Sequence, residues 1–188
     1  MRYPFVKIAT SCVLALAFVG SAADAQAQAA KGSVVVTSPT YASVVMDITI
    51  NRPVADVWKR VGKYCDVSEW LQAPAPCKML SGKDGEVGAV RSPGNGEVLV
   101  ARTEYSYTYT QTPKEGTPYN LYHGTIEARP VTPTTTKIIY TLFFDNSMLA
   151  DDAARAADKE ARRARFSKAL ENMKILAEGG TLTPLPAK

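Results

Sequence analysis

Three tyrosines alternate with hydroxyl-bearing residues in one short segment of the sequence. Tyr105, Tyr107 and Tyr109 are separated by Ser106 and Thr108, so all three rings lie on one face if the segment is a strand. A phenol hydroxyl left buried without a hydrogen-bond partner costs about 1–3 kcal/mol. Converging tyrosines therefore need one another, water or the polar groups of a bound molecule. An aromatic strand that simply packs a core shows the same pattern, and both interpretations stay open.

The single histidine is the other candidate for proton transfer. His123 follows Tyr122, so alternation places it on the opposite face of a strand, together with Glu127. A bulge at Gly124 would turn His123 inward, where it would be a general base with Tyr122 or Tyr140 as the acid. A lone histidine is more often a surface residue, and we expect this one to point away from the tyrosines.

Other chemistries lack the residues that they need. One histidine and three cysteines are too few for a Cys/His zinc site, so no metal is predicted. The sequence has no Gly-x-Ser-x-Gly motif, phosphate-binding glycine loop, dinucleotide fingerprint or His-Glu-x-x-His motif, and no cofactor is predicted. The formal net charge of +4 is too small to predict nucleic-acid binding.

Residues 1–25 have the pattern of a secretory signal peptide. A basic start precedes the apolar run 8–20, and small residues come next, up to Ala25. The apolar run is shorter than the roughly 20 residues of a membrane-spanning helix, so no permanent membrane anchor is expected. Residues 26–40 are predicted to be a leader segment, with cleavage after Ala25 or Ala27. The protein is therefore expected in the periplasm or the secreted medium.

Export would leave two cysteines in an oxidising compartment. Cys65 and Cys77 are predicted to form a disulfide there, and closing so short a loop contributes roughly 3 kcal/mol in the chain-entropy model. Two buried free thiols are the alternative. No Cys-x-x-Cys motif is present, so a redox role is not expected.

Periodicity and turn residues predict the elements that would position these side chains. Residues 41–50 are predicted to form a first strand, and a helix comes after Pro53, with an apolar stripe at the spacing i, i+3, i+4 and i+7. A short helical turn is predicted over residues 66–71. Later strands are separated by turn residues, which predicts an antiparallel meander. These strands span residues 87–91, 97–103, 105–111, 120–129 and 136–145.

A long helix over residues 150–178 is the last predicted element. Its apolar stripe includes Phe166, Leu170 and Met173, and Gly179-Gly180 ends it. The first half, residues 151–165, is crowded with charge and is predicted to be a solvated helix end, with a docking surface as the alternative. Residues 181–188 are predicted to be a flexible tail.

The order of elements and several short motifs resemble one known family. The motifs are Asn51-Arg-Pro-Val-Ala-Asp-Val-Trp58, Trp70, Gly85-Glu-Val-Gly-Ala-Val-Arg91, the tyrosine strand and the helix end Leu176-Ala-Glu178. Over about residues 41–178 they resemble the START/polyketide cyclase-like (SRPBCC) superfamily, in an exported bacterial-type member. The resemblance implies an α+β helix-grip fold for residues 41–180. In it, a curved antiparallel sheet of six or seven strands wraps around a long C-terminal helix, with two short helices after the first strand.

The resemblance also implies a ligand cavity between the sheet and the helix. In the family's register the tyrosine face points inward, and the residues expected to line the cavity are Val98, Val100, Arg102, Tyr105, Tyr107, Tyr109, Tyr122, Tyr140, Leu142, Phe144, Phe166 and Met173. Arg102 would bind a carboxylate or phenolate if its neighbours Val98 and Val100 face inward. Arg91 falls where the family places an entrance loop, here residues 92–96, which is either a lid or a simple hairpin.

These features favour a protein that binds a small hydrophobic molecule. An inward face rich in phenols suits a flat, partly oxygenated aromatic or polycyclic ligand better than a plain fatty chain. The alternative is a cyclase or lyase that acts on such a substrate through Tyr122, Tyr140 and His123. A third possibility is an interaction module of the cell envelope whose interior is filled by its own side chains.

Overall fold

The computed structural model describes residues 36, 38–92, 96–114 and 116–184. The predicted signal peptide and most of the predicted leader lie outside the described residues. The same holds for residues 93–95 of the expected entrance loop and residues 185–188 of the expected tail.

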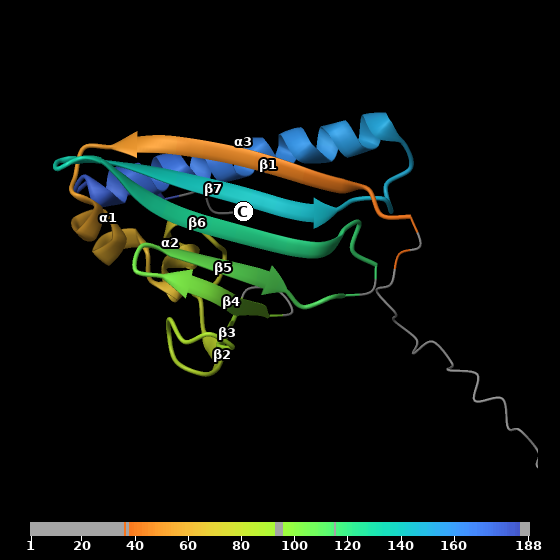
Figure 1. Cartoon of the computed structure of the whole chain (residues 1–188), viewed down its shortest axis with the longest axis horizontal. Coiled ribbons are helices and arrows are strands. Elements are labelled where there is room, and N and C mark those ends of the chain that lie inside the picture. The colour runs from red at the N-terminus through yellow and green to blue at the C-terminus, as the bar shows by residue number, and fades with distance from the viewer. Residues whose placement is uncertain (1–35, 37, 93–95, 115, 185–188) are drawn as a thin grey trace, which may run out of the picture. The chain divides into compact units, whose positions relative to one another are not determined.

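A seven-stranded antiparallel sheet forms the body of the domain (Figure 1). Its spatial order is β1-β7-β6-β5-β4-β3-β2, so each strand from β2 to β7 lies beside its neighbour in sequence, and β1 closes against β7. The strands are β1 Tyr41–Ile50, β2 Met79–Ser81, β3 Val90–Arg91, β4 Glu97–Thr103, β5 Ser106–Gln111, β6 Asn120–Thr132 and β7 Thr135–Asp145.

The helices lie on one face of this sheet. The long helix α3, Asp152–Ala177, runs along the sheet, and the short helices α1, Val54–Val61, and α2, Val67–Trp70, gather at one end of the domain (Figure 1). A 3₁₀ turn, Tyr64–Asp66, links α1 to α2. This arrangement confirms the predicted α+β helix-grip fold.

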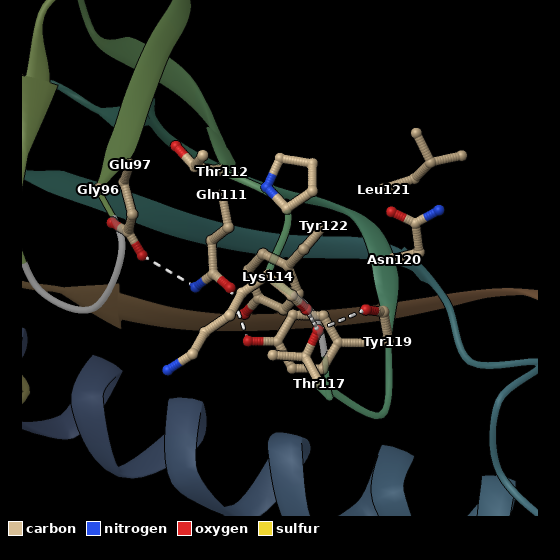
Figure 2. Close-up of a pocket in the computed structure, with 11 residues that line it drawn as sticks. Gly96, Glu97, Gln111, Thr112, Lys114, Thr117, Tyr119, Asn120, Leu121 and Tyr122 are labelled. Atoms are coloured by element: carbon tan, nitrogen blue, oxygen red, sulfur yellow. Dashed lines mark hydrogen bonds between the residues drawn. The ribbon is translucent and has the colours of Figure 1, made fainter. Parts of the chain in front are cut away.

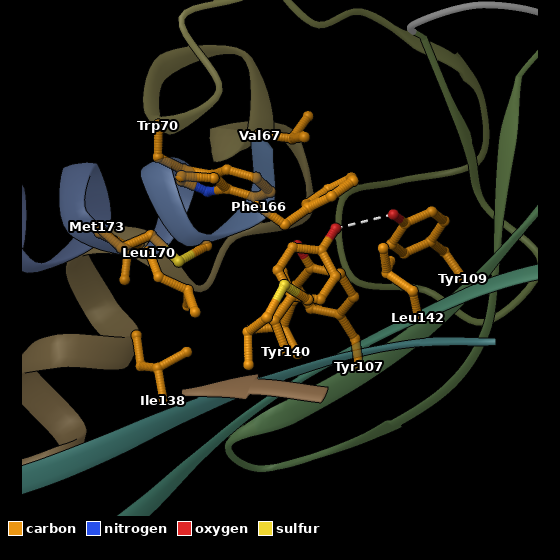
Figure 3. Packing of buried hydrophobic residues seen from close by; sticks show 14 of the residues in the cluster. Val67, Trp70, Tyr107, Tyr109, Ile138, Tyr140, Leu142, Phe166, Leu170 and Met173 are labelled. Atoms are coloured by element: carbon orange, nitrogen blue, oxygen red, sulfur yellow. Dashed lines mark hydrogen bonds between the residues drawn. The ribbon is translucent and has the colours of Figure 1, made fainter. Parts of the chain in front are cut away.

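The core sits between the sheet and α3. Along β7 every second residue faces inward, and Ile138, Tyr140, Leu142 and Phe144 are fully buried. The buried stripe of α3 meets them at residues that the periodicity predicted, among them Phe166, Leu170 and Met173 (Figure 3). Their burial is what holds the helix on the sheet.

Several strands differ from the prediction. β2 was not expected, because a three-residue strand has too short a pattern to show alternation. β3 covers only Val90–Arg91, since Gly88 adopts a positive φ of 90° just before it. The predicted break at residues 130–135 is narrower than expected. β6 runs through Pro130 to Thr132, and the register shifts between these two residues.

The predicted disulfide is present. Cys65 and Cys77 are joined with a Cα–Cα distance of 5.4 Å across 12 positions of the sequence. The bond ties the 3₁₀ turn to the segment that leads into β2. It therefore fixes the chain between α1 and the edge of the sheet.

The segment after α3 begins against the domain. Gly179 adopts a φ of 93° just past the helix, as is common where helices end. Leu182 packs against the core, and the Thr183 carbonyl accepts a hydrogen bond from Gln72 Nε2 at 2.7 Å. Among the described helices, none combines the length and the hydropathy needed to cross a bilayer.

Candidate ligand-binding site

Two adjoining pockets open near the N-terminal half of α3. The first, which we call the helix pocket, has a volume of about 330 Å³ and is lined by Val67, Leu71, Glu97, Tyr109, Gln111, Tyr119, Tyr122, Asp158, Ala161, Arg162, Arg165 and Phe166. The second, the rim pocket, has a volume of about 310 Å³ and extends toward Lys114 and Leu121 (Figure 2). Both pockets are lined by Glu97, Gln111, Tyr119 and Tyr122.

A chain of hydrogen bonds runs along the wall that the two pockets share. Tyr119 Oη donates to Gln111 Oε1 at 2.8 Å, and Gln111 Nε2 donates to Glu97 Oε1 at 3.0 Å (Figure 2). The other oxygen of the carboxylate, Glu97 Oε2, accepts from Arg91 Nε at 2.9 Å. Each polar group is thus oriented by the next, and the Glu97 carboxylate is held at its position beside the pockets.

Arg91 is the buried end of this chain. Its side chain is fully buried, and its Nη2 lies 2.7 Å from Glu97 Oε2 in an ion pair. Nη1 donates to the carbonyl of Tyr64, and the guanidinium lies 4.0 Å from the Tyr64 ring centroid and 4.9 Å from that of Tyr109. Arg91 is the last residue of β3 and directly precedes residues 92–96, where the entrance loop is expected. Its side chain crosses the interior and joins β3, β4 and the 3₁₀ turn.

A second arginine reaches the site from α3. The Arg162 side chain is only 14% exposed and lies 3.0 Å from Asp158, one helical turn earlier. Its guanidinium lies 4.6, 5.3 and 4.3 Å from the ring centroids of Tyr119, Tyr122 and Phe144. This part of the charged half of α3 therefore faces the sheet instead of forming a solvated helix end.

The buried tyrosines satisfy part of their hydrogen bonding among themselves. The hydroxyls of Tyr109 and Tyr140 lie 2.8 Å apart (Figure 3). Gly124 makes room for the Tyr109 ring, because a Cβ on Gly124 would come within 2.4 Å of it. Burial raises the pKa of Tyr122 to about 12 and the pKa of Tyr109 well above its usual range. At neutral pH these side chains are uncharged phenols.

Three of the residues expected to bind a ligand line the helix pocket. They are Tyr109, Tyr122 and Phe166. Four others are buried in the core instead, namely Tyr140, Leu142, Phe144 and Met173. Tyr107 is also buried, with its ring edge-on to Tyr64 at 5.3 Å.

The inward-facing prediction for β4 is wrong at Val98 and Val100. Glu97 and Leu99 are the buried residues of this strand, and Val100 is 41% exposed. A bulge after Leu99 makes Val100 an extra residue, so Arg102 pairs across the strands with Tyr107. Arg102 is nonetheless exposed.

Tyr105 lies outside the predicted cavity, whereas His123 points away from the buried tyrosines, as alternation predicted. Tyr105 sits in the turn before β5 and is only half-buried. His123 is on the outer face of the sheet, near Phe143, and its Nδ1 lies 2.8 Å from the Leu121 carbonyl oxygen. The irregularity in β6 falls at Leu121, with a φ of 48°, and alternation is regular from Tyr122 onward. Tyr122, His123 and Tyr140 are therefore not assembled as a catalytic set.

The sequence reasoning missed several residues of the site. Glu97, Gln111, Tyr119 and Arg162 were not singled out as ligand-binding residues. Arg162 precedes Phe166 by four positions, which places it on the same helical stripe. That spacing was the available signal. Glu97 gave none, because its inward position depends on the strand register.

Comparison with protein families gives one match over most of the chain. Residues 41–178 match the model of the family described as polyketide cyclase/dehydrase and lipid transport. No curated protein matches the chain.

Several solved structures share the fold at low sequence identity. One is a solution structure from Thermobifida fusca, 19% identical with a TM-score of 0.60, covering 75% of this chain and 97% of its own. Norcoclaurine synthase from Thalictrum flavum is 11% identical with a TM-score of 0.59, covering 79% and 100%. The aromatase/cyclase Zhui from Streptomyces sp. R1128 is 16% identical with a TM-score of 0.56, covering 76% and 100%. At these identities the likeness concerns the fold.

The buried ion pair leads to a first prediction. Glu97→Gln leaves the Arg91 charge buried without a counter-ion, so we expect the free energy of unfolding to fall by about 3 kcal/mol. Glu127→Gln is the matched control, because it breaks the exposed Arg129–Glu127 pair and should cost under about 1 kcal/mol. Urea unfolding of both variants measures the difference. An equal loss of unfolding free energy in the two variants would show that the buried ion pair stabilises the fold no more than the exposed one.

Alkaline pH should destabilise the protein through its buried phenols. The pKa of Tyr122 is raised from 10.0 to about 12 in the folded state, so the unfolded chain loses this proton first as pH rises. The stabilisation is complete below about pH 10 and is lost as pH rises toward 12. Melting temperatures across this range should fall less steeply for Tyr122→Phe than for the wild type. The exposed Tyr41→Phe is the control, and an equal effect of both variants would contradict the prediction.

Proposed function

The chain belongs to the polyketide cyclase/dehydrase and lipid transport family, and we propose that it binds a flat, largely apolar and partly oxygenated small molecule in the helix pocket. The observation that carries this proposal is the pocket itself, an open space between the curled sheet and α3 with aromatic and polar walls. Its volume lies at the lower end of the roughly 300–1,000 Å³ that is usual for small-molecule sites.

The apolar walls favour a ring system. Tyr109, Tyr122 and Phe166 contribute aromatic surface from the sheet and from α3, with Val67 and Leu71 beside them. Planar ligands gain from stacked or edge-on contact with such rings, whereas a flexible chain must lose conformational freedom to lie among them. The walls therefore support an aromatic or polycyclic ligand over a plain fatty chain.

Three polar residues of the helix pocket, Glu97, Gln111 and Tyr119, lie together at the wall shared with the rim pocket. Tyr119 donates its proton to Gln111, and its oxygen retains a lone pair for a ligand hydroxyl. Gln111 Nε2 has a second hydrogen besides the one donated to Glu97, and this hydrogen can meet a carbonyl. A ligand oxygen placed at this end would pair with groups that are already oriented.

The alternative, a cyclase or lyase, would rest on different residues from those first considered. Tyr122 lines the pocket, but Tyr140 is enclosed in the core and His123 faces outward. Glu97 and Asp158 are the carboxylates that line the pocket. Both oxygens of Glu97 already accept hydrogen bonds, from Gln111 and Arg91, and both oxygens of Asp158 accept from Arg162. Accepting a proton would weaken the ion pair with the buried arginine. This arrangement favours binding over proton transfer.

We also propose that the protein is exported. The support is the signal-peptide pattern of residues 1–25 together with the Cys65–Cys77 disulfide, a bond that persists in oxidising compartments.

Export can be tested with the full chain in a Gram-negative host. We expect the periplasmic fraction to contain a form that lacks residues 1–25 or 1–27, with an intact mass lower by two hydrogens because of the disulfide. Leu16→Arg, which interrupts the apolar run, should leave the chain uncleaved in the cytoplasm. Wild-type protein found only in the cytoplasm at full length would refute export.

Ligand binding can be tested by fluorescence quenching with 2-hydroxyanthraquinone as the oxygenated planar probe and dodecanoate as the fatty-chain comparison. We expect the quinone to bind more tightly. Tyr119→Phe removes one hydroxyl but keeps the ring, and should weaken quinone binding by about three- to tenfold, the value of one hydrogen bond. Tyr41→Phe removes an exposed hydroxyl from the outer face and should have no effect.

Three results would count against the proposal. They are no binding of the quinone, tighter binding of dodecanoate, and an equal effect of the two tyrosine variants. Chemical conversion of the bound probe, detected by mass spectrometry, would favour the cyclase or lyase alternative.

A further inference from the structure

We propose that a second pocket, separate from the helix pocket, binds an aromatic carboxylate. This lateral pocket has a volume of about 400 Å³ and lies between the end of α1 and the β4–β5 hairpin. Trp58, Lys59 and Lys63 line it from the helical side, and Arg102 and Tyr107 line it from the hairpin.

Two aromatic rings form the apolar part of the lateral pocket. The Trp58 and Tyr107 rings lie 5.9 Å apart, tilted by 55°. Gly62 allows the indole to lie against the end of α1, because a Cβ there would come within 2.3 Å of the ring. Trp58 is half-buried, so part of its surface is available to a planar ligand. Leu99 adds an apolar side chain to the same pocket.

The charges around these rings are mostly positive. Lys59, Lys63 and Arg102 are three cations that line the pocket, against the single carboxylate of Asp84. Asp84 Oδ1 already accepts a hydrogen bond from the Tyr64 backbone N–H at 2.9 Å. An anion entering the pocket therefore meets an excess of positive charge.

Arg102 is the residue placed to bind the anionic group. The bulge at Val100 puts Arg102 opposite Tyr107, on the face that carries the pocket. Its Nη1 donates to the Gly85 carbonyl at 2.5 Å, which fixes the guanidinium and leaves its other N–H groups for a ligand. A carboxylate matches the planar fork of an arginine, and an attached ring would reach the indole.

The lateral pocket is independent of the helix pocket. No described residue lines both. The buried Arg91 lies between them, with Tyr64 and Tyr107 on one side and Glu97 and Tyr109 on the other. Two different ligands can therefore be bound without sharing a contact, and the second site stands whether or not the helix pocket binds the ligand class proposed for it.

The test compares 2-naphthoate with its neutral analogue 2-naphthamide by isothermal titration calorimetry. We expect the wild type to bind naphthoate about tenfold or more tightly than the amide, as a charge-assisted hydrogen bond to arginine implies. Arg102→Gln should remove this preference. Lys59 is an exposed helix residue away from the Gly85 contact, so Lys59→Gln should reduce the preference for naphthoate without removing it. Added salt should reduce the preference further.

Two control variants make the result specific. Arg129→Gln removes an exposed arginine from the outer face and should change nothing. Arg162→Gln changes a residue that lines the helix pocket and not the lateral pocket, so it should also leave naphthoate affinity unchanged. Equal affinity for acid and amide, no binding of either probe, or equal losses for Arg102→Gln and Arg129→Gln would overturn the proposal. A loss confined to Arg162→Gln would overturn it too, since that result places the probe in the helix pocket.

Discussion

A guanidinium group removed from water must be surrounded by acceptors, and this requirement at Arg91 organises one side of the domain. β3 is only two residues long, so its own ladder holds it weakly, and the Arg91 side chain adds a further attachment. It reaches Glu97 on β4 and the Tyr64 carbonyl in the 3₁₀ turn. The disulfide at Cys65, next to Tyr64, fixes the same turn covalently. Ionic and covalent links thus converge where the sheet edge meets the short helices.

The same ion pair also begins the chain of hydrogen bonds that orients the polar groups beside the pockets. Arg91 orients Glu97, Glu97 orients Gln111, and Gln111 orients Tyr119. The orientation of the Tyr119 hydroxyl therefore depends on the buried charge of Arg91. The Tyr109–Tyr140 pair, in contrast, satisfies itself inside the core. Phenols therefore have two roles in this interior. Some complete the packing, and those near the mouth keep hydrogen-bonding capacity.

The sequence predicted the features that depend on periodicity and missed those that depend on register. The long helix, the longer strands and the cysteine pair result from spacing that is visible in the sequence. Side chains of a strand alternate between the two faces of the sheet. The single extra residue at Val100 therefore moves each residue after it in β4 to the opposite face from the one that alternation predicts. The backbone irregularity at Leu121 likewise has no signal in the side chains around it. The charged half of the last helix was predicted to be solvated, which hid Arg162, and Glu97 was not singled out, because burial of a charge depends on partners distant in sequence.

The two halves of α3 explain where a pocket can persist. In the C-terminal half, Leu170, Met173 and Leu176 face an apolar sheet, and nothing prevents close packing. In the N-terminal half, Arg162 and Asp158 face a wall that carries Glu97 and Gln111, and bringing these surfaces together would strip water from groups whose hydrogen bonds are not all met internally. The space stays open because closing it is unfavourable. Under the proposed function, a ligand that supplies oxygen atoms to the polar wall and rings to the aromatic one would remove that obstacle, which is the physical basis for proposing both features in one molecule.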